Sequence, residues 1–466
     1  METLQRTANR GSVSTGYDID NSLCFEDANS ESVTKNYTGD GNMKTWTYST
    51  WVKKVKFTST EFDYMYMFAG QNTSIHFLNN GILRVALYNG SSTVYADIDR
   101  LFRDASAWYH IIVALDTTQS TAADRVKIYI NGVRETVFDN STYTGMSQNE
   151  EFTIGQASAN YQVGYFYAGG GSNYGFSGYM AETHYVNGTA LDQDSFGEFD
   201  SDSGIWIPKE YTGSHGSKGF YLKFDDSSNL GKDSATSGIG DFTVSNITAV
   251  DQATDTPTNN FCTWNPQWEY LYQPLFSNGA TVAGYHDSTD ENAKSTIGLT
   301  NGKWYWEAQP SGTIGSQFIG IATANTAYTI GGEGLTQNYN MTIEPQGRYY
   351  SYSGSLSESS AGQFTALSTS DVLGIALDMD SSTQTIKYYA NGSLILTRDL
   401  ISNMQGKTVF PFLQNYESRT FNINFGGFTV NTISSAASDA NGYGTFEHAP
   451  PSGYYAICTK NLAQYG

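Results

Sequence analysis

The sequence predicts an all-β protein made of two antiparallel β-sandwich (jelly-roll) domains joined by a polar connector. Runs rich in Val, Ile, Thr, Tyr, Phe and Trp recur at roughly 8–15 residues and end in Asn-Gly, Asp-Gly or Ser-Gly turns, which is the pattern of short strands. A sustained 3.6-residue apolar period, which would indicate helices, does not occur. At roughly 100–200 residues per domain, the length allows two to four domains.

The composition excludes several classes of protein. The chain has 25 basic and 46 acidic residues, a formal charge of −21, so nucleic-acid binding through a basic face is disfavoured. Only 15% of the residues are charged, against about 25% in an average soluble domain. Gly (47), Tyr (34) and Phe (25) fill the difference, and a hydrophobic fraction of 39% is enough to build cores.

Apolar runs such as Ile111–Leu115 are far shorter than the roughly 20 residues that span a bilayer, so we expect no membrane insertion. The polar N-terminus does not resemble a signal peptide. The three cysteines, Cys24, Cys262 and Cys458, lie far apart without metal-binding spacing. Synthesis in a reducing cytoplasm fits these observations.

Individual strands can be predicted in order along the chain. Thr45–Lys53 alternates large apolar with small polar residues, and Arg125–Ile130 alternates before Asn131-Gly132, a hairpin signal. The two halves also share a pattern: a strand ending in Leu-Asp, a polar turn, and a strand closed by Asn-Gly, at 114–132 and at 376–392. We favour a hairpin design common to both sandwiches; the alternative is coincidence, because Asn-Gly follows many strands. The polar composition of 225–260 predicts a connector with one strand at Asp241–Val244.

The first half of the chain resembles a concanavalin A-like, laminin-G-like jelly roll over about residues 18–225. That fold carries, in order, a Trp-Val-Lys strand, a Trp-Tyr-His strand, an Asn-Gly hairpin, and a late strand with a Phe-x-Gly pattern that ends in Glu. The segments that carry the resemblance are Trp46–Lys53, Trp108–Val113, Lys127–Gly132, Phe152–Gly155 and Phe176–Glu182.

The second half resembles a SPRY domain over about residues 275–427. The segments are Gly302–Glu307, with the sequence GKWYWE, and the later strands at Gly320–Ala322, Asp371–Asp378, Lys387–Gly392 and Phe421–Gly426. The predicted organisation is an N-terminal arm at 1–17, a concanavalin A-like domain at 18–225, a connector at 226–274, a SPRY-like domain at 275–430 and a C-terminal extension at 431–466.

The combination of these two domains resembles virion and tail-fibre-like proteins of tailed phages. The resemblance implies a non-enzymatic structural protein on the virion surface, made in the host cytoplasm: a compact head-decoration protein, or a tail-associated knob or fibre protein that aids host attachment. It implies repeated copies or a homo-oligomer, with other virion proteins and a host glycan or protein as partners. The alternatives are a glycan-binding receptor adhesin of the tail and, less favoured, a glycan hydrolase.

No catalytic residue is predicted, so we expect the protein not to be an enzyme. Retaining glycosidases need two carboxylates about 5–5.5 Å apart. The nearest candidate, Glu198-Phe199-Asp200, lacks a third Glu and lies in a Gly- and Ser-rich stretch where a turn is expected. His110 and His184 lie in predicted strands and are interpreted as hydrogen-bonded sandwich histidines rather than general bases.

Calcium is the one candidate cofactor, because laminin-G-like folds often bind it through loop oxygens. The candidate ligands are Asp97, Asp99, Asp116 and Asp124, although no loop has EF-hand spacing and most surface Asp side chains are solvated.

The best ligand-binding candidate is the stretch 160–176, where Tyr161, Tyr165, Tyr167 and Tyr174 lie among glycines. Tyrosine offers a flat apolar face for a sugar ring and a hydroxyl for hydrogen bonds, and Tyr with Gly and Ser also makes adaptable protein contacts. The alternative is a loop that packs its own aromatic side chains on the sandwich. Segments 328–340 and 351–363 of the SPRY-like half are candidate partner-binding loops, and the arm at 1–17 is expected to dock on another virion protein.

Overall fold

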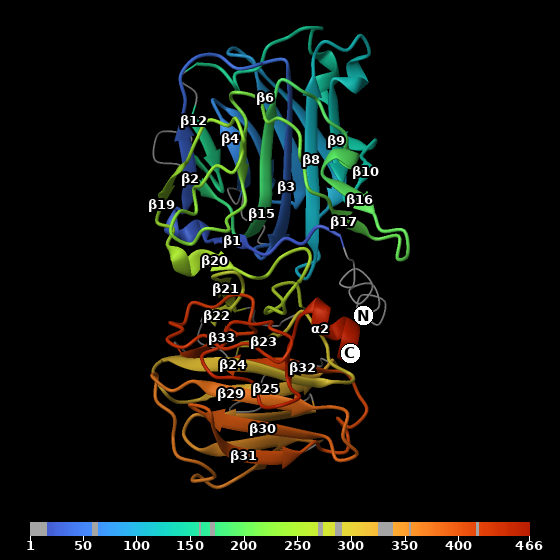
Figure 1. The fold of residues 1–466 in the computed structure, drawn as a ribbon. Helices are drawn as coiled ribbons and strands as arrows, with labels where there is room; N and C mark the ends of the chain where they lie inside the picture. Colours follow the sequence, from blue (N-terminus) through green and yellow to red (C-terminus); the bar gives the residue numbers. More distant parts are fainter. Residues whose placement is uncertain are drawn as a thin grey trace. The chain divides into compact units, whose positions relative to one another are not determined.

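The computed structural model describes residues 16–57, 64–157, 160–167, 173–268, 274–284, 291–324, 339–353, 356–415 and 419–466. The chain divides into an N-terminal unit, Ser14–Thr258, and a C-terminal unit that contains Asn259–Gly466 (Figure 1). Both units are built almost entirely of antiparallel strands, which confirms the predicted all-β class. No helix within these ranges is long and apolar enough to cross a bilayer.

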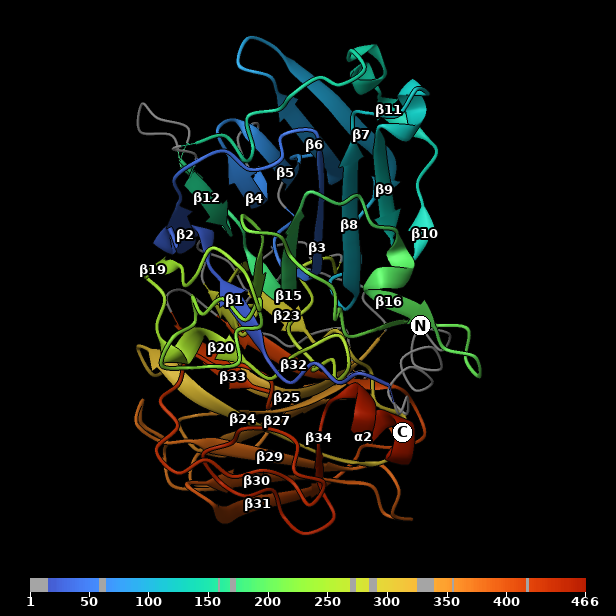
Figure 2. The same ribbon diagram turned by 45° about the horizontal axis from the view of Figure 1, so that its top comes forward.

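The N-terminal unit is a sandwich of two eight-stranded sheets, which we call A and B. The A sheet runs in the order β10 (Val133–Arg134), β9 (Val126–Ile130), β8 (Trp108–Asp116), β3 (Thr45–Lys54), β15 (Gly178–Asn187), β1 (Ser22–Phe25) and β20 (Gln252–Ala253), and β18 (Phe220–Leu222) pairs with β15. The B sheet, whose strands can be followed in Figure 2, runs in the order β11 (Phe138–Asn140), β7 (Thr93–Leu101), β6 (Ile82–Tyr88), β5 (Thr73–Phe77), β4 (Met65–Gly70), β12 (Asn160–Val163), β2 (Ser32–Asn36) and β19 (Thr243–Ser245).

Smaller elements complete this unit. They are the hairpin of β13 (Tyr165–Tyr167) and β14 (Asn173–Gly175), the hairpin of β16 (Gly197–Phe199) and β17 (Trp206–Pro208), and five 3₁₀ turns at Asp27–Asn29, Ala122–Asp124, Thr142–Gly145, Gln193–Ser195 and Ala249–Asp251.

The core of the N-terminal unit lies between the two sheets, because successive side chains of a strand point to opposite faces. On β3, Trp46, Tyr48 and Val52 are buried in this core. Tyr48 stacks on Phe68 of the B sheet with ring centroids 4.8 Å apart, so aromatic side chains join the two layers.

The C-terminal unit is a second sandwich, of an eight-stranded C sheet and a six-stranded D sheet. The C sheet runs in the order β21 (Leu275–Ser277), β22 (Val282–Gly284), β33 (Arg419–Asn424), β24 (Lys303–Gly312), β29 (Leu373–Asp378), β30 (Thr385–Ala390) and β31 (Ser393–Asp399), and β34 (Tyr455–Ala456) pairs with β24. The D sheet runs in the order β23 (Glu291–Lys294), β32 (Val409–Asn415), β25 (Gln317–Thr323), β26 (Asn340–Glu344), β27 (Arg348–Tyr352) and β28 (Leu356–Glu358). A short helix, α2 (Thr459–Tyr465), follows.

The two units share the hairpin design that the sequence pattern predicts. Trp46 lies opposite Leu115, and Trp304 lies opposite Leu377. Each hairpin ends at an Asn in the left-handed region, Asn131 (φ 47°) and Asn391 (φ 46°). The Asn131 side-chain oxygen accepts the His110 backbone N–H at 2.7 Å, and that of Asn391 accepts the Val372 N–H at 2.9 Å.

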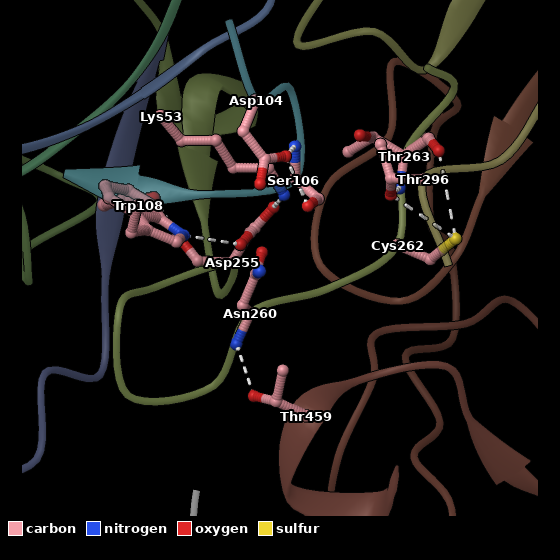
Figure 3. Close-up of polar contacts among 11 residues, drawn as sticks. Lys53, Asp104, Ser106, Trp108, Asp255, Asn260, Cys262, Thr263, Thr296 and Thr459 are labelled. Atoms are coloured by element: carbon pink, nitrogen blue, oxygen red, sulfur yellow. Dashed lines mark hydrogen bonds and ion pairs between the residues drawn. The ribbon is translucent and has the colours of Figure 1, made fainter. Parts of the chain in front are cut away.

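The segment predicted as a connector is instead divided between the two units, since the chain changes unit at Thr258. β19 pairs with β2 where the sequence suggested a strand, and β20 pairs with β1. The Asp255 carboxylate forms a buried ion pair with Lys53 at 2.7 Å and accepts the Trp108 indole N–H at 3.1 Å (Figure 3). The polar side chains of this segment therefore find specific partners on the A sheet.

The C-terminal extension also packs on its own sandwich. The Glu307 carboxylate of β24 is buried and accepts the backbone N–H groups of Glu447 and His448, each at 2.8 Å. The Asn260 N–H donates to the Thr459 hydroxyl at 3.0 Å (Figure 3). The extension and the residues that follow Thr258 thus belong to one folded unit.

Candidate functional site

Four polar and aromatic side chains form one row across the side of the B sheet that faces away from the core, and three of them, Tyr66, His76 and Asp97, are buried. Tyr66 lies opposite His76, His76 opposite Arg84, and Arg84 opposite Asp97. Their sequence neighbours on the same strands fill the core, so the strand alternation directs these four side chains to the outer face.

Arg84 and Asp97 form a two-point ion pair. The Arg84 Nε and Nη2 donate to the two carboxylate oxygens of Asp97 at 2.9 and 2.7 Å. These hydrogen bonds raise the pKa of Arg84. The Arg84 guanidinium also lies 4.5 Å from the centroid of the Tyr95 ring, a cation–π contact that orients both side chains.

His76 is the buried centre of the row, with 4% of its surface exposed. Its Nδ1 is 3.1 Å from the Ser74 hydroxyl, and its ring stacks on Tyr66 with centroids 4.2 Å apart. Burial, together with the positive charge of Arg84, lowers the pKa of His76 to about 3. The imidazole is therefore neutral at physiological pH.

The β13–β14 hairpin places two further aromatic rings on this face. Phe166 stacks on Tyr66 at 4.7 Å, and Tyr174 lies 5.6 Å from Tyr66 and 5.7 Å from Tyr64. The hairpin leaves β12 through Gly164, whose φ of +75° suits glycine, and a Cβ there would lie 2.2 Å from the Phe25 ring.

We call this set the outer aromatic face: Tyr64, Tyr66, His76, Arg84, Tyr95, Asp97, Phe166 and Tyr174. Within it, the residues Tyr64, Tyr95, Phe166 and Tyr174 are half-buried. Flat apolar rings beside fixed hydrogen-bonding groups match the two needs of a sugar, an apolar ring face and hydroxyl groups.

The structure places the four predicted tyrosines differently. Tyr174 belongs to the outer aromatic face, Tyr165 is half-buried on β13, and Tyr167 is 57% exposed at the described end of that strand. Residues 168–172 between the two strands lie outside the described residues.

Tyr161 corrects the prediction, because none of its surface is exposed. It lies in the sandwich core, 4.4 Å from Tyr37 between ring centroids, and its hydroxyl donates to the Lys218 carbonyl at 3.2 Å. The cause is the strand period: on β12, Tyr161 and Val163 point inward, a position that leaves no face for a ligand.

Sequence reasoning missed Tyr66, His76 and Arg84, and it named Asp97 only as a candidate calcium ligand; the four residues come from four different strands. The signal available was alternation on each strand, as in Ile82–Tyr88, where Arg84 interrupts an apolar run. Their meeting depends on the register of three strand pairs, which the sequence does not specify.

Three of the four candidate calcium ligands have separate partners. Asp97 is held by Arg84, the Asp116 carboxylate accepts the Thr118 N–H at 3.0 Å in a turn, and Asp124 pairs with Arg134 at 3.0 Å. Asp99 is exposed. In the part of the chain that the structure describes, no group of three His, Cys, Asp or Glu side chains is arranged to hold a metal.

The two strand histidines are hydrogen-bonded within the sandwich, as predicted. His110 accepts the Trp206 indole N–H at Nδ1, 2.9 Å away, and its Nε2 lies 2.8 Å from the Ser49 hydroxyl. Burial lowers the pKa of His110 well below its usual value. The His184 Nδ1 is 3.0 Å from the His215 Nε2.

The weak glycosidase candidate does not form a facing carboxylate pair on one strand. Gly197–Phe199 is a short strand rather than the expected turn, with Glu198 exposed. Asp200 begins the turn that follows, where its carboxylate accepts the Ser203 N–H and hydroxyl at 2.7 and 2.6 Å.

Comparison with protein families supports the resemblance of the first half of the chain to a laminin-G-like fold. Residues 27–194 match the laminin G model described as the concanavalin A-like lectin/glucanases superfamily. The match agrees with the resemblance over residues 18–225 and covers most strands of the N-terminal sandwich. No curated protein matches the chain.

Solved structures are similar at low identity. A putative carbohydrate binding protein from Bacteroides ovatus is 16% identical, covering 49% of this chain and 58% of that one, with a TM-score of 0.34. The SPRY domain of human HERC1 is 13% identical over 34% of this chain and 96% of its own, with a TM-score of 0.27. The mouse laminin α1 chain domains LG4-5 are 10% identical over 93% and 88%, with a TM-score of 0.29. The chain spans little more than half of the Bacteroides protein.

Proposed function

We propose that this chain is a non-enzymatic binding protein whose N-terminal unit binds carbohydrate through the outer aromatic face. The observation that carries the proposal is the group of half-buried rings, Tyr64, Tyr95, Phe166 and Tyr174, around a fixed Arg84–Asp97 pair. Aromatic residues that only fill a core are buried, whereas these four residues are half-buried on the outer side of the sheet.

The surrounding side chains support a preformed site. The Tyr66–His76 stack and the Arg84–Asp97 hydrogen bonds fix the polar groups before any ligand arrives. A site ordered in advance loses less conformational entropy when it binds, which favours affinity from a small contact area.

The test is binding to an array of immobilised glycans. We expect the intact chain to bind at least one glycan, and Phe166→Ala and Tyr174→Ala to weaken that binding about tenfold each, because each loses a stacking ring. Tyr352→Ala is the matched control, since it removes a half-buried tyrosine from the C-terminal unit. Equal binding by all variants, with circular dichroism unchanged, contradicts the proposal.

We further propose that the protein lies on the surface of a tailed-phage virion, in repeated copies, and aids attachment to the host. The support is the order of the two domain types along the chain, which resembles virion and tail-fibre-like proteins. Gold-labelled antibody against this chain should decorate intact particles on the head or the tail. Absence of label on particles, with label on lysate protein, contradicts this placement.

The non-enzymatic part has its own test. Incubating the chain with every glycan that it binds should release no reducing sugar. Release that is lost in Glu198→Gln or Asp200→Asn would instead assign hydrolysis to the β16–β17 hairpin.

A further inference from the structure

The outer aromatic face has a balanced charge, although the whole chain carries −21. Its formal charges are those of Arg84 and Asp97, which cancel across hydrogen bonds of 2.9 and 2.7 Å. Its tyrosines contribute hydroxyl-bearing rings, and His76 stacks in neutral form on Tyr66.

The Arg84–Asp97 pair is held too tightly to act as a free cation. Asp97 is 2% exposed and uses both carboxylate oxygens on Arg84. An anionic ligand that approached Arg84 would have to compete with a bidentate carboxylate already in place. The guanidinium plane is further occupied by the Tyr95 ring at 4.5 Å.

The charges nearest to the face give no attraction for anions. Asp99, two residues beyond Asp97 on β7, is exposed. Arg100 on the same strand pairs with Glu135 at 2.6 Å, and Lys56, near the base of the β13–β14 hairpin, pairs with Asp27. Added to the chain's overall negative charge, this arrangement repels sulfate and carboxylate groups at a distance.

We propose that the outer aromatic face selects uncharged saccharides and rejects sulfated or uronic ones. The inference rests on the proposed carbohydrate binding and adds the class of sugar to it. The Arg84–Asp97 pair acts here as a positioning group that presents N–H donors to sugar hydroxyls, while Phe166 and Tyr174 supply the surface on which an apolar ring face stacks.

Salt dependence tests the proposal on the intact chain. The probes are immobilised neutral oligosaccharides and the same oligosaccharides after chemical sulfation. We expect the neutral set to bind, with an affinity that changes less than about twofold between about 20 and about 500 mM salt, because no net charge is neutralised. Sulfation should weaken binding at least about fivefold at the lower salt concentration.

A variant that removes the Asp97 charge tests whether the balanced charge is what excludes sulfated saccharides. Asp97→Asn keeps the side-chain shape but leaves Arg84 uncompensated, so binding to the sulfated probes should rise about fivefold and fall again as salt is added. Thermal melting shows whether the variant is folded. Arg100→Gln is the matched control, because it removes a charge of the same strand outside the face.

The outcomes separate the two proposals. Preference of the wild-type chain for sulfated probes, or neutral binding that falls steeply with salt, overturns the charge inference while leaving carbohydrate binding in place. A folded Asp97→Asn variant that gains no sulfated binding also overturns it. Binding to neither probe set overturns the proposed function and this inference together. If Asp97→Asn does not fold, the comparison of the two probe sets on the wild-type chain still decides.

Discussion

In each unit a buried carboxylate joins a ten-residue strand to a later segment of the chain, which we call the covering segment, but its charge is compensated differently in the two units. In the N-terminal unit the carboxylate is Asp255, on the covering segment, and its partner is the Lys53 ammonium of β3. In the C-terminal unit the carboxylate is Glu307, on β24, which accepts two backbone N–H groups of the covering segment, the Tyr305 hydroxyl at 3.1 Å and the Asn424 amide at 3.4 Å.

The difference shows that two units with the same hairpin design can attach a covering segment through different interactions, an ion pair in one and hydrogen bonds to a carboxylate in the other. A buried ion pair depends on both partners, since removing one leaves a charge without compensation. A carboxylate held by backbone N–H groups and neutral side-chain donors depends less on any single partner, because no one partner supplies the compensating charge. The two attachments should therefore respond differently to substitution and to pH.

Loss of the Lys53 ammonium should have the largest effect. Lys53→Met leaves the buried Asp255 carboxyl group without its ion-pair partner, and we expect the N-terminal unit to lose about 3–5 kcal/mol of unfolding free energy. Urea unfolding of the intact chain measures this loss. The double variant Lys53→Met/Asp255→Leu should recover most of it, and equal losses in the single and double variants would contradict a compensated pair.

Loss of the Glu307 carboxylate should have the next largest effect. Glu307→Ala leaves the backbone N–H groups of Glu447 and His448 without their acceptor, so the C-terminal unit should lose about 2–4 kcal/mol. Hydrogen exchange in peptides around Glu447 and His448 should rise first. Ser49→Ala, at the corresponding outer position of β3, is the control and should lose about 1 kcal/mol, because only a neutral hydroxyl contact is removed. If Ser49→Ala lost more unfolding free energy than Glu307→Ala, the proposed role of the Glu307 carboxylate would be contradicted.

The shared hairpins should respond alike. Asn131→Ala and Asn391→Ala each remove a side-chain acceptor and place a Cβ-bearing residue with poor left-handed tolerance at φ near +47°, so each unit should lose about 1–2 kcal/mol. Asn→Gly at each site keeps the backbone freedom and separates the two contributions. Losses that differ by more than about 1 kcal/mol between the units would contradict a common design.

Lowering the pH should change the unfolding free energies of the two units by different amounts, and this effect is smaller than those above. Burial lowers the pKa values of His76 and His215 to about 3 and that of His110 further, so the unfolded chain binds these protons near pH 6.5 and the folded chain does not. This stabilisation is present above pH 6.5 and is lost as the pH falls. Glu31, whose pKa is raised by burial to about 7, acts in the opposite direction with one proton.

We therefore expect the N-terminal unit to lose on the order of 1 kcal/mol between pH 7 and 6, since three histidines outweigh one carboxyl group. Burial lowers the pKa of Lys54 in the N-terminal unit and of Lys294 in the C-terminal unit to about 7, so both units also lose a similar, smaller amount of stability over this change. Hydrogen exchange on β8 and on β29 at both pH values reads the two units separately. A greater loss of protection on β29 would contradict the assignment.

Much of the framework could be predicted from sequence because it depends on local pattern. The alternation in Thr45–Lys53 and the Asn-Gly closure after Ile130 define strands and turns without knowledge of their partners. The polar segment after Asp225 misled the prediction, because composition does not show that Asp255 meets Lys53, 202 positions earlier.

The candidate site could be predicted only in part. Tyr174 stood out as a tyrosine among glycines, yet the same criterion selected Tyr161, which points into the core. The position of each tyrosine in the strand alternation decides which face it occupies, because a shift of one residue along a strand moves a side chain to the other face. The Tyr66–His76–Arg84–Asp97 row required the pairing of four strands, which no local pattern contains.

The most direct test of the central claim, carbohydrate binding on the outer aromatic face, is hydrogen exchange of the intact chain with and without a bound neutral oligosaccharide. We predict slowed exchange in peptides that contain β4, β5, β6 and β14, and unchanged exchange on β8 and throughout the C-terminal unit. Slowed exchange confined to the C-terminal unit, or to the β16–β17 hairpin, would contradict the claim and move the binding site away from the B sheet.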